Sequence, residues 1–176
     1  MSDTARSERF EREALPHLDA AYNLARWLTR NDQDAQDVTQ EACLSAFRFF
    51  DGYQGGNMRT WLLTIVRNTC HTWLHKYRRA DSKELFNEEI HGPDVSGNFD
   101  PEIHVLDSAE RETLNRALEE LSDVFREALV LRELEGMSYK EIADVTASSI
   151  GTVMSRLARA RTQLRQALTV ELSRGY

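Results

Sequence analysis

The chain has 176 residues, 41% of them hydrophobic, which is enough apolar material for one or two small domains with a packed core. Its formal net charge of -7 differs from the basic character of most free-standing DNA-binding proteins. No apolar run is long enough to span a membrane, and the start MSDTARSERF lacks the features of a signal peptide. We therefore expect a cytoplasmic protein without membrane insertion, in which Cys43 and Cys70 are reduced and buried thiols.

The first third of the chain predicts two helical stretches. Apolar residues recur at helical spacing over 8–30, with a break expected near Leu15 because Pro16 suits only the first turn of a helix. A turn at Asn31 and Asp32 precedes a second helix over 34–50. We expect its buried stripe to consist of Ala35, Val38, Ala42, Ala46 and Phe49. Its mixed outer face suits either solvation or the docking of a partner.

A glycine-rich loop over 51–57 leads into a long helix predicted over 59–79. The helical spacing of Trp61, Trp73 and Tyr77 favours core packing for these rings. The second half of the helix, RNTCHTWLHKYRR, combines aromatic and basic residues without an acid, which suits contact with single-stranded nucleic acid. His71 and His75 have a spacing that can chelate a metal, but no third ligand is near, so no metal or other cofactor is expected.

The middle of the chain is strongly acidic. Between residues 81 and 123 thirteen acidic residues face three basic ones. The part over 80–101 has weak periodicity and is predicted to be a flexible linker. Helical periodicity returns over 106–121, and a further helix is predicted from the N-cap Ser122 to about Glu135, ended by Gly136.

The last forty residues or so predict a helix-turn-helix. Ser138 and Glu141 form a capping box, and Ser149 is the expected N-cap of a second, longer helix. No acid occurs between residues 151 and 170, and arginines flank the apolar stripe of this helix. Such a helix is typical of those that enter the DNA major groove, and a basic face that is merely solvated is the alternative. The sequence shows no nucleophile–base pair, phosphate-binding glycine loop or paired catalytic carboxylates, so an enzyme is not expected.

Three blocks in this order resemble the extracytoplasmic-function, or group IV, sigma factors of the sigma-70 family. They are DAQDVTQEACLSAFR, RTWLLTIVRNT, and FREALVLRELEGMSYKEIADV followed by IGTVMSRLARAR. The resemblance implies an all-α protein with two helical domains, sigma region 2 over 1–80 and sigma region 4 over 106–176, joined by a flexible acidic linker over 81–105. It also implies a factor that binds core RNA polymerase and directs promoter-specific transcription, in a stress response and under control of an anti-sigma factor.

The resemblance assigns site residues to three surfaces. Contacts with the β′ clamp helices of the polymerase are expected from Asp34, Asp37, Gln40, Glu41 and Leu44. The flipped base and strand of the −10 element are expected to contact Tyr53, Asn57, Arg59, Arg67, Asn68, Lys76, Arg78 and Arg79, with Trp61 anchoring the loop. The −35 element is expected to contact Ser149, Thr152, Met154, Ser155, Arg156, Ala158 and Arg159. The domain over 106–176 is also expected to contact the polymerase β flap.

The chain departs from the family pattern at four positions: Thr72 replaces an aspartate, Ser122 a proline, Ala147 a glycine, and Met154 a lysine or arginine. A left-handed backbone at Ala147 would cost roughly 1 kcal/mol. Two other functions fit parts of the sequence. One is a free-standing helix-turn-helix regulator of duplex operators, and the other is a sigma-like decoy that binds an anti-sigma factor without transcribing.

Overall fold

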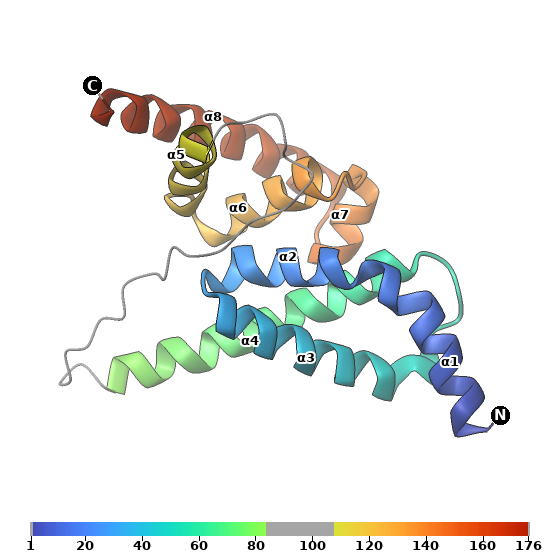
Figure 1. The fold of residues 1–176 in the computed structure, drawn as a ribbon. Coiled ribbons are helices and arrows are strands. Elements are labelled where there is room, and N and C mark those ends of the chain that lie inside the picture. The colour runs from blue at the N-terminus through green and yellow to red at the C-terminus, as the bar shows by residue number, and fades with distance from the viewer. Residues whose placement is uncertain (1, 84–107, 176) are drawn as a thin grey trace. The chain divides into compact units, whose positions relative to one another are not determined.

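The computed structural model describes residues 2–83 and 108–175, with the backbone alone for 78–83, and every regular element in that part of the chain is helical. The helices form two compact units, which we call the N-terminal unit and the C-terminal unit (Figure 1). This confirms the prediction of two small helical domains. Most of the predicted linker lies outside the described residues, so the domain limits at residues 80 and 106 stay predictions.

The N-terminal unit is built on three helices that pack against one another, α2, α3 and α4, with α1 placed against α4. Alanines on α3 are completely buried, and their small side chains let the neighbouring helices approach closely. The core is completed by leucines and a valine of α2 and α4, together with Cys70. The elements are α1 (Asp3–Ala14), a 3₁₀ turn (Leu15–His17), α2 (Leu18–Thr29), α3 (Asp32–Phe49), a second 3₁₀ turn (Phe50–Gly52) and α4 (Met58–Lys83).

Local signals set most of these boundaries. The break expected near Leu15 is a 3₁₀ turn with Pro16 among its first residues. Helix α2 ends at Arg30, whose backbone is left-handed (φ 59°) and whose N–H donates to the Arg26 carbonyl. Helix α3 begins at Asp32 rather than Asp34, because the Asn31 side chain accepts a hydrogen bond from the Asp34 N–H and so caps the helix.

Two aromatic residues do not lie where the spacing predicted. Phe49 is 60% exposed, and Phe50 fills the core instead because the chain tightens into a 3₁₀ turn at that residue. Tyr77 is 54% exposed and stacks on Trp73, which is half-buried. The prediction of core packing was therefore wrong for Phe49 and Tyr77. Of the two cysteines, Cys70 is buried as expected and Cys43 is half-buried.

The C-terminal unit packs α5 (Ser108–Glu119) and α6 (Asp123–Leu129) against the long helix α8 (Ile150–Arg174). Helix α6 ends earlier than predicted and continues as a π-helical turn (Val130–Leu134), and Gly136 follows with φ 62°. Helix α7 (Tyr139–Thr146) begins with the predicted capping box, since the Ser138 N–H donates to the Glu141 carboxylate and the Glu141 N–H to the Ser138 hydroxyl. Ser122 precedes α6 but makes no side-chain cap hydrogen bond.

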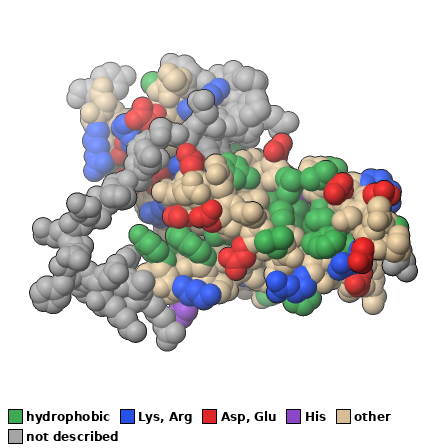
Figure 2. Space-filling model, turned by 60° about the horizontal axis from the view of Figure 1, so that its bottom comes forward, with side chains coloured by type: hydrophobic (Ala, Val, Ile, Leu, Met, Phe, Trp, Pro, Cys, Tyr) green, Lys and Arg blue, Asp and Glu red, His purple; other side chains and the backbone are tan. Residues whose placement is uncertain are grey.

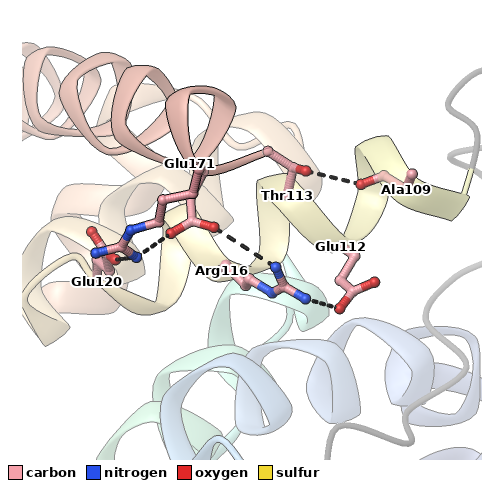
Figure 3. Close-up of polar contacts among 7 residues, drawn as sticks. Ala109, Glu112, Thr113, Arg116, Glu120 and Glu171 are labelled. Atoms are coloured by element: carbon pink, nitrogen blue, oxygen red, sulfur yellow. Dashed lines mark hydrogen bonds and ion pairs between the residues drawn. The ribbon is translucent and has the colours of Figure 1, made fainter. Parts of the chain in front are cut away.

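An ionic network ties the end of α8 to α5 (Figure 3). The Glu171 carboxylate, only 6% exposed, faces Arg174 at 2.8 Å and Arg116 at 3.9 Å. Arg116 also pairs with Glu112 one turn earlier on α5. A buried carboxylate needs such partners, since without them its desolvation would oppose folding. The network thus fixes the last turns of α8 on the body of the unit.

Candidate nucleic-acid interface

The loop before α4 is held by a cluster of aromatic rings. Tyr53 is 7% exposed, stacks on Phe50 at 5.9 Å and lies beside Trp61 with ring centres 5.1 Å apart. The Tyr53 hydroxyl donates to the Gly56 carbonyl at 2.9 Å, which closes the loop, and burial raises the pKa of this hydroxyl. The expectation that Trp61 anchors the loop agrees with this arrangement. Tyr53 itself supports the loop from inside and has little surface for a ligand.

Two glycines and an asparagine shape the exposed part of the same loop. Gly55 and Gly56 have φ angles of 89° and 100°, which residues with a side chain rarely adopt. The Asn57 side-chain oxygen then accepts a hydrogen bond from the Thr60 N–H and begins α4. Asn57 is exposed, and its amide N–H groups are directed away from this cap bond by the geometry of the side chain. The loop is thus a preformed polar rim at the start of α4.

The remaining −10 candidates lie along α4 but point in different directions around the helix. Asn68 and Lys76 are exposed, while Arg59 and Arg67 are half-buried. Burial, followed by the charge of the nearby Arg59 guanidinium, lowers the pKa of the His17 imidazole. The Thr72 hydroxyl donates to the Asn68 carbonyl of the same helix, so its polar group is satisfied locally. The side chains of Arg78 and Arg79 lie outside the described residues.

No acidic residue occurs between residues 52 and 80. The loop and the part of α4 with described side chains therefore contribute no carboxylate of their own. Asp51, directly before this stretch, and Glu13 of α1, which acts on Tyr53, are the acids nearby that the structure records. Phosphate attraction dominates the affinity of proteins for nucleic acid, so a segment without acidic residues suits contact with a DNA or RNA strand.

A second candidate surface lies on α8. The Ser149 hydroxyl accepts a hydrogen bond from the Thr152 N–H at 3.1 Å and donates to the Thr152 hydroxyl at 2.9 Å, which confirms Ser149 as the N-cap. Val153, Leu157 and Ala160 are buried and hold the helix on its unit. The opposite face exposes Met154, Ser155, Ala158 and Arg159, so the structure brings the predicted −35 residues together on one side of the helix.

The arginines of α8 differ in their partners. Arg156 donates to the Ser148 hydroxyl at 2.9 Å, and Arg161 pairs with Glu133 at 3.1 Å. Arg159 makes no hydrogen bond or ion pair with the described residues and is exposed. Of the arginines near the start of α8, Arg159 therefore has the guanidinium that is available to a ligand.

The predicted polymerase-binding residues lie on one exposed side of α3. Asp37, Gln40, Glu41 and Leu44 are exposed, and Leu44 is 61% exposed despite its apolar side chain. Asp34 is half-buried, and burial followed by the charge of Asp37 raises the pKa of its carboxyl. Figure 2 shows that hydrophobic side chains reach the surface among acidic and basic groups on one face of the molecule.

Sequence reasoning assigned no surface role to two apolar residues that the structure exposes beside these surfaces. Phe49 ends α3, and Ile150, 47% exposed, is the first residue of α8. The exposure of Ile150 could have been expected from its position directly after the N-cap, because the first residue of a helix often lies outside the packed core. Phe49 gave no such signal, because it continues the apolar spacing of α3. Among the described residues no helix is long and apolar enough to cross a membrane, and no group of three metal-binding side chains occurs.

Comparison with known proteins identifies both units. A family model for sigma-70 region 2 matches residues 15–80, and one for sigma-70 region 4 matches residues 111–164. The chain is 35% identical over 166 residues to the ECF RNA polymerase sigma factor SigE of Mycolicibacterium smegmatis, covering 94% of this chain and 64% of that protein. It is also 37% identical to the ECF sigma-E factor of Escherichia coli, covering 73% of this chain and 70% of that protein. The chain thus spans less than two thirds of the SigE sequence.

Two solved structures share the fold. The sigma factor RpoE of Bartonella quintana, solved with the anti-sigma factor NepR, matches with a TM-score of 0.73 and 30% identity over 93% of this chain and 98% of that one. CnrH, solved with the cytosolic domain of CnrY, matches with a TM-score of 0.66 and 26% identity over 93% of this chain and 90% of that one. With both sigma-70 regions present in order, the chain belongs to the sigma-70 family, in its extracytoplasmic-function group.

Proposed function

We propose that this protein is an alternative sigma factor that binds core RNA polymerase and directs it to a set of promoters. The observation that carries the proposal is the presence, in one chain, of sigma regions 2 and 4, each containing a stretch of sequence without acidic residues, 52–80 and 151–170. A chain of this kind selects a start site and helps to open DNA, and the chemistry of RNA synthesis stays with the polymerase. Its place of action is the cytoplasm, where that enzyme works.

The N-terminal unit has the two tasks of docking and strand capture in this proposal. The exposed side of α3, with Glu41 and Leu44, binds the β′ clamp helices through an apolar centre and a charged rim. The loop ending at Asn57 and the outer face of α4 around Asn68 hold a base that has left the −10 duplex. Extruding a base opposes binding by a few kcal/mol, so a preformed loop, fixed by the buried Tyr53, is an advantage.

The C-terminal unit reads duplex DNA in this proposal. The start of α8 enters the major groove at the −35 element, with Arg159 directed at bases and Arg156, Thr152 and Ser149 near the phosphates. Because the net charge is -7, the chain as a whole is not attracted strongly to DNA, and binding by both units together is needed. The isolated chain should therefore bind promoters weakly and need core polymerase, whose β flap would hold the C-terminal unit.

Control by an anti-sigma factor completes the proposal. Both similar structures are of complexes: the sigma factor RpoE with the anti-sigma factor NepR in one, and CnrH with the cytosolic domain of CnrY in the other. In this chain Leu44 and Phe49 are large apolar side chains left exposed on α3, and a regulator that covers them would block polymerase. A stress response is the expected setting for such control.

Run-off transcription with purified core polymerase and genomic promoter fragments tests the proposal. We expect specific transcripts that depend on this protein and disappear when Leu44 is replaced by aspartate. A free-standing regulator of duplex operators would instead bind DNA fragments alone and give no polymerase-dependent transcript. A decoy would bind an anti-sigma factor but initiate no transcription. Either of these two results would contradict the proposal.

A further inference from the structure

Three residues of α8 form an apolar strip beside its exposed polar face. Ile150 is 47% exposed and Met154 is 54% exposed, and Ala158 is exposed as well. Residues four apart on an α-helix differ in direction by only about 40°, so these side chains follow one another along the same edge. We call Ile150, Met154 and Ala158 the apolar strip. It lies apart from Val153 and Leu157, which face the core of the unit and are 1% exposed.

The surroundings of the apolar strip indicate a polyanion rather than a protein as its occupant. No acid occurs over residues 151–170, and the strip is bordered by arginines, of which Arg159 is exposed and has no ion pair with the described residues. Gly151 and Ser155 are exposed beside the strip, and their small size permits close approach of a flat surface. The ligand that matches this surface is therefore anionic overall and carries apolar groups that can contact the strip.

The DNA major groove is such a ligand. Each base pair presents hydrogen-bonding groups there, and the C5-methyl group of thymine is its characteristic apolar feature. A methionine side chain can neither donate a hydrogen bond nor pair with guanine as arginine does, but its flexible thioether adapts well to a methyl group. We propose that Ile150 and Met154, with Ala158 beside them, read thymine methyl groups in the −35 element. This inference rests on the proposed function, since it requires α8 to enter the major groove.

The inference gives this chain a specificity of its own. Where a sigma factor with a basic residue at the position of Met154 would favour guanine, this protein should favour an A·T pair with its thymine methyl towards α8. Arg159 and Ser155 supply hydrogen bonds to the neighbouring bases. The −35 element should therefore combine at least one methyl-dependent position with positions read by hydrogen bonding.

Removal of single methyl groups from DNA tests this directly. Holoenzyme made from core polymerase and the full chain first selects its preferred −35 sequence from a duplex library. Each thymine of the selected site is then replaced by deoxyuridine, which keeps base pairing and loses only the methyl group. We expect binding to weaken about fourfold at one or two positions, as follows from the burial of a single methyl group.

Variants of the protein connect the effect to the strip. Met154→Ala and Ile150→Ala should each weaken binding to thymine-containing DNA, and one of them should abolish the difference between thymine and deoxyuridine at a given position. Val170→Ala is the matched control, because Val170 is a 45% exposed apolar residue on the same helix, far from its start. Met154→Arg should change the preferred base at the Met154 position from thymine to guanine.

The outcomes separate the inference from the function on which it rests. Holoenzyme that reads a −35 element but binds thymine and deoxyuridine sites equally well overturns the inference alone. The same holds if the difference persists unchanged in both alanine variants, or if these variants lose affinity only for an anti-sigma protein. Holoenzyme without any −35 preference overturns the proposed function together with the inference.

Discussion

The Nε of Arg126 donates a hydrogen bond to the carbonyl of Leu118 at 3.1 Å, in the interior of the C-terminal unit. The Arg126 side chain is fully buried, and its Nη2 donates also to the Leu121 carbonyl at 2.9 Å and pairs with Asp123 at 3.2 Å. One guanidinium thus donates to the Leu118 carbonyl, which also accepts from the Leu121 N–H, and to the Leu121 carbonyl beyond the end of α5. This bond network fixes the turn between α5 and α6, and so the frame on which α8 lies.

Replacement of Arg126 by methionine should therefore destabilise the C-terminal unit by about 3 kcal/mol, since the buried hydrogen bonds from a charged guanidinium to two carbonyls are lost. Urea unfolding followed by circular dichroism measures this as an earlier loss of helix. Trp27, Trp61 and Trp73 are the tryptophans of the chain and all lie in the N-terminal unit, so the midpoint of their fluorescence should not change. Unchanged helix loss, or an equal shift of both signals, would contradict the prediction.

Ala147 has a left-handed backbone (φ 51°), the conformation for which glycine is the usual residue. Ala147→Gly should stabilise the protein by about 1 kcal/mol, because glycine adopts this conformation without the steric penalty of a Cβ. Ala158→Gly, in the middle of α8, is the control of opposite sign and should destabilise by a similar amount. Unfolding in urea distinguishes the two, and a loss of stability in Ala147→Gly would show that the strain is absent.

The sequence predicted those features that depend on neighbours within a few residues. The capping box of Ser138 and Glu141 and the N-cap Ser149 each involve a partner three residues away. At Ala147 the cost of a left-handed backbone suggested a rearranged turn, but the structure keeps that backbone. Helical spacing also predicted the buried faces of α3 and α8 almost completely. The residues outside these buried faces could then be predicted to be exposed, and the family resemblance supplied their expected roles.

Features set by distant partners could not be predicted in this way. Arg126 looked like an ordinary charged residue, and only the fold brings it under the end of α5. Arg6 donates to the Phe47 carbonyl and pairs with Asp51, forty-five positions away in the chain, so the anchor of the loop region was not visible in the sequence. Phe49 was assigned to the core because spacing cannot show where a 3₁₀ turn replaces the helix.

The role proposed for Asn68 leads to a separation of two activities. Asn68 is exposed on α4, away from the α3 face, so Asn68→Ala should reduce promoter opening strongly and leave affinity for core polymerase unchanged. Opening is measured by permanganate reactivity of unpaired thymines, and core binding by fluorescence anisotropy. Gln40→Ala on α3 is the control with the reverse pattern. Equal losses of both activities in Asn68→Ala would count against a role of Asn68 in holding the extruded base.

Cys43 should be a slow nucleophile. Burial raises the pKa of its thiol, so the fraction of reactive thiolate at neutral pH is below that of a free cysteine, and Cys70 is completely buried. Iodoacetamide at pH 7 should therefore leave both thiols of the native protein largely unmodified and label both in urea, as read by mass spectrometry. Labelling of native Cys43 should increase as the pH is raised. Rapid labelling at pH 7 would contradict this and reopen a redox role.

Asp34 should reduce stability at neutral pH. Its pKa is raised in the folded protein by burial and by Asp37, so the folded state favours the protonated form. Stability linked to this group is fully present below the ordinary value of 3.8 and is lost as pH rises through the higher folded value. Asp34→Asn should therefore be more stable than the wild type at pH 7 and equally stable at pH 3, by tryptophan fluorescence in urea. Asn31→Ala, which removes the cap of α3, should lose about 1 kcal/mol at both pH values. If Asp34→Asn is more stable at pH 7 but binds core polymerase more weakly, Asp34 serves docking at the expense of folding stability. Equal stability of Asp34→Asn and wild type from pH 3 to pH 7 would contradict the prediction.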